Sequence, residues 1–229
     1  MYLLHIGNKN YSSWSLRPWA VMTELGIPFQ EKLWRFDDAH AWEEYRRGAA
    51  RNGKVPCLID GDTAVWDSLA IVEYLAERHA GVWPAASTAR SWARSAAAEM
   101  HSGFNELRSR CSMTCGVRIR LNEFPEALER DVANIGNLWN DGLRRFGGPY
   151  LAGSAFTAAD AFFAPVAFRA QTYALPLDPA SAAYVARLLE LPSMRQWYAA
   201  ALRESFRDPP HEQEMLRMGT VLADFRMAS

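Results

Sequence analysis

Two short segments carry residue types that could hold a small ligand. Gly53-Lys54-Val55-Pro56 places a proline directly before the apolar run Cys57-Leu58-Ile59. Because proline has no N–H to donate, it suits the start of a strand or a special turn, where its peptide bond can be cis. Trp66-Asp67-Ser68-Leu69-Ala70-Ile71 places Asp and Ser at the start of an apolar helix, where free N–H groups and the helix dipole favour an anion. Together the segments predict a site for a small, peptide-like ligand that carries carboxylates.

Short strands and helices that alternate over residues 1–80 must position these segments. Apolar runs and turn residues predict strands at Tyr2–Ile6, Phe29–Trp34, Cys57–Ile59 and Ala64–Trp66. Helical spacing predicts helices at Ser15–Leu25, with Pro18 in its first turn, at Ala39–Arg47 and at Ser68–Arg78. The predicted order is therefore β-α-β-α-β-β-α. Its βαβ start implies a parallel strand pair, and its closing hairpin adds an antiparallel edge.

Beyond a linker at residues 79–84, the sequence predicts helices and no strands. The helices are predicted at residues 88–111, 125–146, 158–173, 180–189 and 192–203. Gly103 lies inside the first of them. A glycine there lowers the stability of the helix by about 1 kcal/mol relative to alanine, and it could permit the close approach of a ligand or another helix. Thr157 and Asp160 have the spacing of a capping box before an apolar helix, which predicts a structural role at the domain centre. Residues 208–229 are expected to pack back on the body.

The composition excludes several classes of protein. The chain has 229 residues, 49% hydrophobic and 22% charged, with a net charge of −1, as is typical of a globular protein of one or two domains. This charge predicts no nucleic-acid or anionic-membrane partner, and no apolar run approaches the ~20 residues of a membrane span. The N-terminus lacks the features of a signal peptide.

The cysteines indicate a reducing compartment, and we therefore expect a cytoplasmic protein. Three cysteines, Cys57, Cys111 and Cys115, give an odd number without a C-x-x-C pair. Cys111 and Cys115 have no nearby His or Cys pair that would complete a metal site, so no metal is expected.

In combination, three motifs resemble those of cytosolic glutathione transferases. They are Gly53-Lys54-Val55-Pro56, Asp67-Ser68-Leu69-Ala70-Ile71 and Thr157-Ala158-Ala159-Asp160, and the resemblance covers nearly the whole chain. It implies an α/β plus all-α fold, with a thioredoxin-like domain at residues 1–80 and a helical bundle at residues 81–229. The segment Tyr11-Ser12-Ser13-Trp14-Ser15-Leu16-Arg17-Pro18 resembles serine-type members, including the zeta-like group and related bacterial transferases. This chain has Trp14 where the zeta-like motif usually has Cys.

The resemblance implies glutathione as co-substrate and a thiol-activating role for serine. Transfer of the sulfur to an electrophile needs the thiolate, whereas a free thiol has a pKa of about 8.5. Ser12 is the first choice for the hydroxyl that donates to the sulfur. Ser13 and the backbone around Trp14 come next. The alternative role of the serines is to cap the first helix.

The resemblance also implies which residues bind glutathione. Val55 would offer its main chain to the cysteinyl part, with Pro56 fixing the geometry through a cis bond. Ser68 would hold the γ-glutamyl carboxylate and Asp67 the ammonium, with helix capping as the alternative role of both. Lys54 would either meet the glycyl carboxylate or remain a solvated surface lysine.

The second substrate is expected to bind between the domains. Four candidates for binding it are His101, Phe104, Arg108 and Tyr173. His101 and Phe104 could equally be packing or dimer contacts. Arg108 together with Arg169 is consistent with an acidic electrophile. Arg17 is expected outside the site, as a structural partner of the first helix or a subunit-interface residue.

The leading hypothesis is a homodimeric glutathione transferase that joins the thiol to a small electrophile in detoxification. One alternative is a glutathione-dependent cis–trans isomerase similar to maleylacetoacetate isomerase. Another is a non-catalytic glutathione-binding protein, because a fold does not dictate an activity. A disulfide reductase would need a cysteine in the loop that contains Ser12, Ser13 and Trp14.

Overall fold

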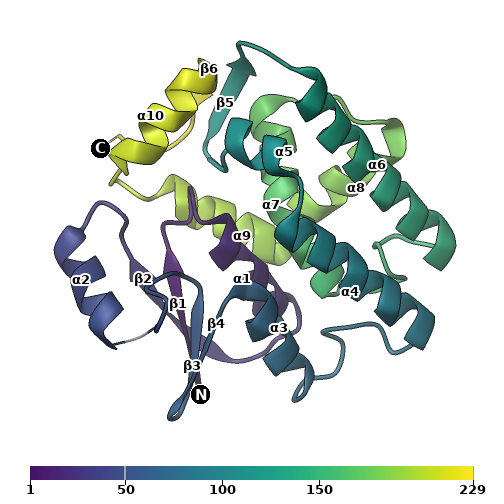
Figure 1. Cartoon of the computed structure of the whole chain (residues 1–229), viewed down its shortest axis with the longest axis horizontal. Coiled ribbons are helices and arrows are strands. Elements are labelled where there is room, and N and C mark those ends of the chain that lie inside the picture. Colours follow the sequence, from purple (N-terminus) through teal and green to yellow (C-terminus); the bar gives the residue numbers. More distant parts are fainter. Residues whose placement is uncertain (49, 229) are drawn as a thin grey trace.

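The computed structural model describes residues 1–48 and 50–228, and its N-terminal domain is built on a four-stranded sheet (Figure 1). The strands are β1 (Tyr2–Gly7), β2 (Phe29–Trp34), β3 (Cys57–Asp60) and β4 (Thr63–Trp66), in the order β2-β1-β3-β4. Strand β1 runs parallel to β2 and antiparallel to β3, and β3 pairs antiparallel with β4. The predicted element order and mixed sheet are confirmed.

Side chains of β1 alternate between the two faces of this sheet. Leu4 and Ile6 are fully buried in the main core, together with apolar side chains of α1 (Ser13–Glu24) and α3 (Ser68–Ala76). His5 belongs to the other face, where it accepts a hydrogen bond from Trp34 Nε1 at 2.7 Å and contacts Tyr45 of α2 (Ala39–Gly48). This period of two follows from the pleat of the strand. The sheet therefore lies between α2 on one face and α1 and α3 on the other.

Helix α1 begins two residues earlier than the sequence predicts. Because it starts at Ser13, Pro18 lies in its second turn rather than its first. Proline has no N–H for the carbonyl four residues earlier, so one helical hydrogen bond is missing there. The early start places Ser12 at the N-cap of α1.

The second domain is a bundle of helices around α7. Its helices are α4 (Ser87–Ser102), α5 (Asn105–Arg110), α6 (Glu126–Phe146), α7 (Ala158–Tyr173), α8 (Pro179–Leu189), α9 (Pro192–Leu202) and α10 (Pro209–Met218). Both α7 and α9 contact α1, which joins the two domains (Figure 1). Within the described residues, none of the helices has the length and apolar character that crossing a membrane requires.

The buried carboxylate of Asp160 organises the start of α7. It accepts hydrogen bonds from the Thr157 N–H at 2.9 Å, the Leu151 N–H at 3.0 Å and the Tyr184 hydroxyl at 2.9 Å. A buried carboxylate is tolerated only when its oxygens are hydrogen-bonded in this way. The predicted structural role of Thr157 and Asp160 is therefore confirmed.

The prediction of one continuous helix over residues 88–111 is wrong. The chain leaves the helix at Gly103, which is extended, and Phe104 adopts a left-handed conformation with a φ of 57° before α5 begins. A Cβ at Gly103 would lie 2.9 Å from the Glu99 carbonyl oxygen. The glycine is therefore needed where the backbone turns sharply, rather than for a close helix–helix contact.

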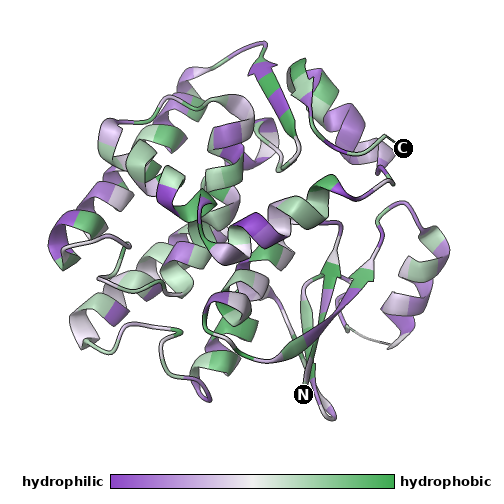
Figure 2. Ribbon diagram, turned by 180° about the vertical axis from the view of Figure 1, so that it is seen from behind, coloured by the Kyte–Doolittle hydropathy of each residue, from purple (hydrophilic) through white to green (hydrophobic). Residues whose placement is uncertain are grey.

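The prediction of no strands in the second domain is also wrong. Strands β5 (Val117–Leu121) and β6 (Gly219–Asp224) form an antiparallel ribbon. Figure 2 shows the alternation of hydrophobic and hydrophilic residues along β5, which is the period of a half-buried strand. Its partner lies about a hundred residues further along the chain, so the ribbon depends on how the C-terminus packs back. That packing was predicted and is confirmed by the hydrogen bond from the Phe225 N–H to the Gly116 carbonyl, at 2.9 Å.

Candidate functional site

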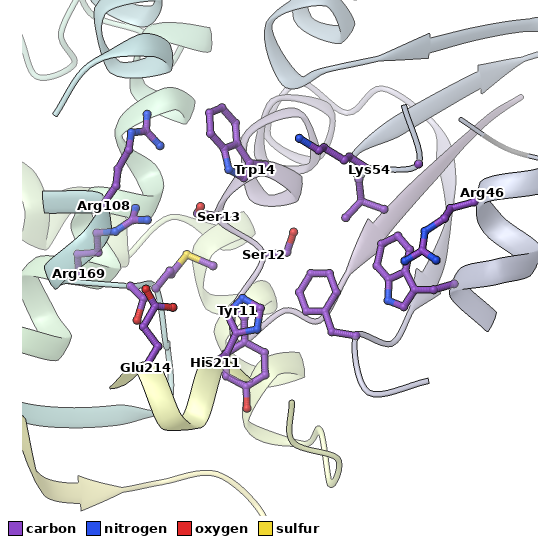
Figure 3. A pocket seen from close by; sticks show the side chains of 16 residues that line it. Tyr11, Ser12, Ser13, Trp14, Arg46, Lys54, Arg108, Arg169, His211 and Glu214 are labelled. Atoms are coloured by element: carbon purple, nitrogen blue, oxygen red, sulfur yellow. The ribbon is translucent and has the colours of Figure 1, made fainter. Parts of the chain in front are cut away.

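A cavity of about 560 Å³ lies between the domains, at the N-terminus of α1 (Figure 3). Its walls come from the loop before α1, from the region of α2 and from the second domain. The lining residues are Tyr11, Ser12, Ser13, Trp14, Phe36, Trp42, Arg46, Gly53, Lys54, Val55, Arg108, Ser112, Met113, Arg169, His211 and Glu214.

The two predicted catalytic serines lie at the floor of this cavity, at the start of α1. The Ser12 hydroxyl donates to Ser15 Oγ at 2.7 Å, and Ser15 Oγ also accepts from the Gly7 N–H at 3.2 Å. The Ser13 hydroxyl has no hydrogen-bond partner in the described part of the chain. No side chain caps the first turn of α1. The Ser13 N–H donates to the Tyr11 carbonyl at 2.9 Å, whereas the N–H groups of Trp14 and Ser15 have no partner among the described residues. These two groups and the positive end of the helix dipole can stabilise an anion.

A smaller cavity of about 210 Å³ adjoins the first and brings together the two segments that the sequence singled out. Trp14, Lys54 and Val55 line both cavities. The smaller one is lined by Trp14, Asn52, Lys54, Val55, Pro56, Asp67 and Ser68, which include all six predicted glutathione-binding residues. The peptide bond between Val55 and Pro56 is cis, as the resemblance implies. Neither main-chain group of Val55 has a hydrogen-bond partner among the described residues.

Asp67 caps α3 and has a further partner across the domain junction. Its Oδ1 accepts from the Leu69 N–H at 2.8 Å, and its Oδ2 lies 3.4 Å from His101 Nε2. The backbone of Asp67 has a φ of 79°, which is unusual for a residue with a side chain and costs free energy. The predicted capping role of Asp67 is confirmed, and one carboxylate oxygen still faces the junction.

Arg17 lies against predicted glutathione-binding residues, although we expected it outside the site. Its guanidinium is fully buried, 4.1 Å from the centre of the Trp14 ring and 4.8 Å from that of Phe162. Its Nη1 donates to Ser68 Oγ at 3.3 Å. Its Nε and Nη2 have no partner among the described residues. Burial, together with the positive charges of two other arginines, holds the pKa of Arg17 well below its usual range.

The four candidates for binding the second substrate occupy different places. Arg108 lines the larger cavity, 4.8 Å from the Trp14 ring centre, and donates to the carbonyls of Met100, His101 and Gly103 at the end of α4. His101 instead faces Asp67 and the edge of the Trp14 ring. Burial lowers its pKa, so the imidazole is neutral at neutral pH.

Phe104 and Tyr173 do not line the larger cavity. Phe104 is 7% exposed and packs in the core, at the point where the chain turns from α4 into α5. Tyr173 is 5% exposed and its hydroxyl donates to the Ser112 carbonyl at 2.9 Å. Burial raises the pKa of its phenol. Tyr173 therefore supports the cavity wall through Ser112, whereas Phe104 is a core residue.

The C-terminal segment forms a wall that the sequence did not predict. His211 of α10 lies between the rings of Tyr11 and Phe36, with centroid distances of 4.9 and 5.2 Å, and Phe36 stacks in turn on Trp42 at 5.6 Å. The Asp208 carboxylate bonds to His211 Nδ1. Asp208-Pro209 is a helix-start signal that could have revealed α10. No local signal connects residue 211 with residue 11.

The described residues contain no group of His, Cys, Asp and Glu side chains that could hold a metal ion.

Comparisons with known proteins agree with this architecture. The family model described as the N-terminal domain of glutathione S-transferase matches residues 11–78, and that of the C-terminal domain matches residues 85–200. Glutathione S-transferase-like protein OpS6 of Beauveria bassiana is 30% identical over 200 residues, which cover 78% of this chain and 88% of that protein.

Solved structures share the fold at lower identity. A glutathione transferase homologue from Burkholderia gl BGR1 with bound glutathione has a TM-score of 0.65 and 23% identity, covering 87% of this chain and 97% of that one. Ure2p in complex with S-hexylglutathione has a TM-score of 0.64 and 17% identity, and the match covers 86% of this chain and 97% of that one. The two family models match residues 11–78 and 85–200, in this order and over more than half of the chain, so this protein belongs to the glutathione S-transferase family.

Proposed function

We propose that this protein joins the thiol of glutathione to a small electrophile, with a serine hydroxyl stabilising the thiolate. The observation that carries the proposal is the position of Ser12 and Ser13 in the larger cavity, at the uncapped start of α1 and next to Trp14, which lines both cavities. Residues 1–80 would hold glutathione in the smaller cavity. Residues 81–229 would supply the far wall for the electrophile.

The smaller cavity suits an extended peptide with a carboxylate at each end. The unpaired main-chain groups of Val55 would bond to the cysteinyl residue as an added strand does. The start of α3 at Ser68, with Arg17 beside its hydroxyl, would bind the γ-glutamyl carboxylate. The exposed oxygen of Asp67 would take the ammonium, and Lys54 is within the same cavity for the glycyl carboxylate.

The serine loop can supply the hydrogen bonds that a thiolate needs. Lowering a thiol pKa by about two units requires roughly 2.7 kcal/mol, which is the order of one or two charge-assisted hydrogen bonds. The bond between Ser12 and Ser15 joins two hydroxyls, so its direction can reverse. With Ser15 donating to Ser12, the Ser12 hydrogen becomes free for the sulfur. The Gly7 N–H still donates to Ser15.

Serine-to-alanine variants test this role. Ser12→Ala and Ser13→Ala, alone and together, should show which hydroxyl acts, and the double variant should lose at least about tenfold in turnover, or 1.4 kcal/mol of transition-state stabilisation. Glutathione affinity, measured by calorimetry, should stay within about twofold because the hydroxyls contact only the sulfur. Ser95→Ala, on the exposed face of α4, is the matched control. Unchanged turnover in the double variant would refute the assignment.

Titration of bound glutathione separates the proposal from non-catalytic binding. The thiolate absorbs in the ultraviolet, so the ionisation of the bound thiol can be followed by titration. A free thiol has a pKa of about 8.5, and the titration midpoint of protein-bound glutathione should lie about two pH units lower. A midpoint that stays well above pH 8 would instead favour a glutathione-binding protein without transferase activity. Mass analysis of the product distinguishes a transferase, whose product retains glutathione, from an isomerase, whose product does not.

We also propose a homodimer in the cytoplasm. Cys111 and Cys115 are buried thiols, and the chain has an odd number of cysteines without a C-x-x-C pair, which fits a reducing compartment. Light scattering of the purified protein tests the oligomeric state.

A further inference from the structure

Two arginines from different helices lie on the far wall of the larger cavity (Figure 3). Arg169 of α7 is 3% exposed, and its Nε donates to the Cys111 carbonyl at 2.7 Å. Its Nη1 is buried and has no hydrogen-bond partner among the described residues. Arg108 of α5 donates to main-chain carbonyls and to no carboxylate in the described part of the chain.

Arg169 forms no ion pair among the described residues, although the carboxylate of Glu214 of α10 lines the same cavity (Figure 3). The positive charges of Arg108 and Arg17 repel it, and the nearby hydroxyl of Tyr173 and thiols of Cys111 and Cys115 are neutral at pH 7 because burial raises their pKa values. Burial and the charge of Arg108 lower the pKa of Arg169 to about 10, so it still carries its charge at neutral pH. A buried charge without a partner is costly, and an anion in the cavity would relieve that cost.

The carboxylates of glutathione do not account for this site. Their proposed partners, Lys54 and Ser68, line the smaller cavity, and neither Arg108 nor Arg169 does. Figure 3 shows Arg108 and Arg169 on the opposite side of Ser13 and Trp14 from Lys54. The anion that Arg169 suits must therefore belong to another molecule, next to the proposed position of the sulfur.

We propose that Arg169, assisted by Arg108, binds a carboxylate of the second substrate, so that this protein acts on electrophiles that carry a carboxylate group. The inference rests on the proposed transferase function. Guanidinium groups bind carboxylates through paired, charge-assisted hydrogen bonds, and the unpaired Nη1 is the donor available for them. Met113 and Trp14, on the same walls, offer apolar surface to the carbon skeleton.

A pair of matched aryl chlorides tests the proposal. The substrates are 4-chloro-3,5-dinitrobenzoate and its methyl ester, which share the reacting carbon and differ in charge. In both, the sulfur–carbon bond forms, the carbon–chlorine bond breaks, chloride leaves with the electron pair, and the thiol proton passes to solvent. Each kcat/KM is divided by the uncatalysed rate with glutathione, which removes the difference in intrinsic reactivity.

The wild-type protein should prefer the carboxylate by about tenfold or more, the size expected from one charge-assisted hydrogen bond. Arg169→Gln should abolish the preference, and Arg169→Lys should restore part of it because the charge returns. Arg108→Gln tests the same site from another helix and should weaken the preference. Arg195→Gln, whose side chain is 69% exposed on α9, is the matched control and should keep it.

Binding of an unreactive probe gives a second measurement that does not need turnover. The probes are 3,5-dinitrobenzoate and its methyl ester, titrated calorimetrically into the glutathione-loaded protein. If the wild type binds the carboxylate probe more tightly than the ester and Arg169→Gln does not, the carboxylate site is supported. This holds even if neither chloride is turned over, and that result would refute only the transferase function. Turnover of both chlorides without a preference, together with equal binding of the two probes, would overturn the site and leave the transferase function standing.

Discussion

The buried guanidinium of Arg17 connects the serine loop with the start of α3. It lies between the rings of Trp14 and Phe162 and donates to Ser68 Oγ, while two of its nitrogens remain unpaired among the described residues. Stacking on two rings offsets part of the cost of burying the charge. Under the proposed function, a γ-glutamyl carboxylate bound at the start of α3 would be a partner for the unpaired nitrogens.

This arrangement predicts opposite effects of Arg17→Met on stability and on binding. Methionine fills a similar space without a buried charge, so the melting temperature of the ligand-free protein should stay unchanged or rise. The affinity for glutathione should fall by about tenfold or more, because a carboxylate partner is lost. Thermal unfolding and calorimetry measure the two effects. A parallel loss of stability and affinity would show that Arg17 only holds the fold.

At the scale of elements, the C-terminal segment is attached to the serine loop through Glu212 of α10. The Arg226 guanidinium donates to both oxygens of Glu212, at 2.6 and 2.9 Å, and the Tyr11 hydroxyl donates at 2.6 Å. Burial alone would raise the pKa of Glu212, but these hydrogen bonds outweigh it and the pKa lies below its usual value. The helix that carries His211 is thereby held over the cavity.

Acid should release this segment. A carboxylate with a lowered pKa stabilises the folded state above its unfolded pKa of about 4.3, and this contribution is lost as the pH falls through the folded value. The protection of the amides of residues 209–224, measured as their exchange rate relative to the intrinsic rate at the same pH, should therefore fall below about pH 4. Glu212→Gln should show the faster exchange already at neutral pH, whereas Glu214→Gln on the same helix should not. Equal protection in Glu212→Gln and the wild type would contradict the attachment.

At the scale of the whole molecule, the second domain positions the serine loop of the first. Glu204, beyond the end of α9, accepts from the Lys9 N–H at 2.6 Å, the Asn10 N–H at 3.2 Å and Asn10 Nδ2 at 3.1 Å. Trp197 Nε1 donates to the Lys9 carbonyl at 2.8 Å, and the Cys115 N–H donates to the Asn10 carbonyl at 3.2 Å. The main chain just before Ser12 is therefore held largely from across the domain junction.

Glu204→Gln should weaken both domains together. The amide keeps the size of the side chain but loses one acceptor, and leaving a buried N–H unpaired costs about 1–3 kcal/mol. Because residues of the second domain hold this loop of the first, circular dichroism and tryptophan fluorescence should still report one coincident unfolding transition at lower denaturant. Glu190→Gln, whose side chain is 70% exposed, serves as the control. Two separate transitions in the wild type would contradict this coupling.

The sequence by itself determined the features that depend on near neighbours. Examples are the element order of the first domain, the proline before β3, the capping residue Asp67 and the buried box of Thr157 and Asp160. Each arises from interactions over a few residues, such as helix capping, strand alternation or a missing N–H, and these leave a readable pattern. The break at Gly103 is also local, but a glycine inside an apolar helix is compatible with a continuous helix too.

Only the tertiary structure decided what surrounds the serines. Arg17 and Ser68 are separated by 51 positions, and Tyr11 and Glu212 by 201. His101, Phe104 and Tyr173 were equally plausible wall residues in the sequence, yet they face Asp67, the core and the Ser112 carbonyl. The physical reason is that the period of a helix shows which side chains share a face, but the packing of whole helices sets what that face meets. Tertiary packing alone therefore brings the serine hydroxyls, the aromatic wall of α10 and the unpaired charge of Arg169 to one cavity.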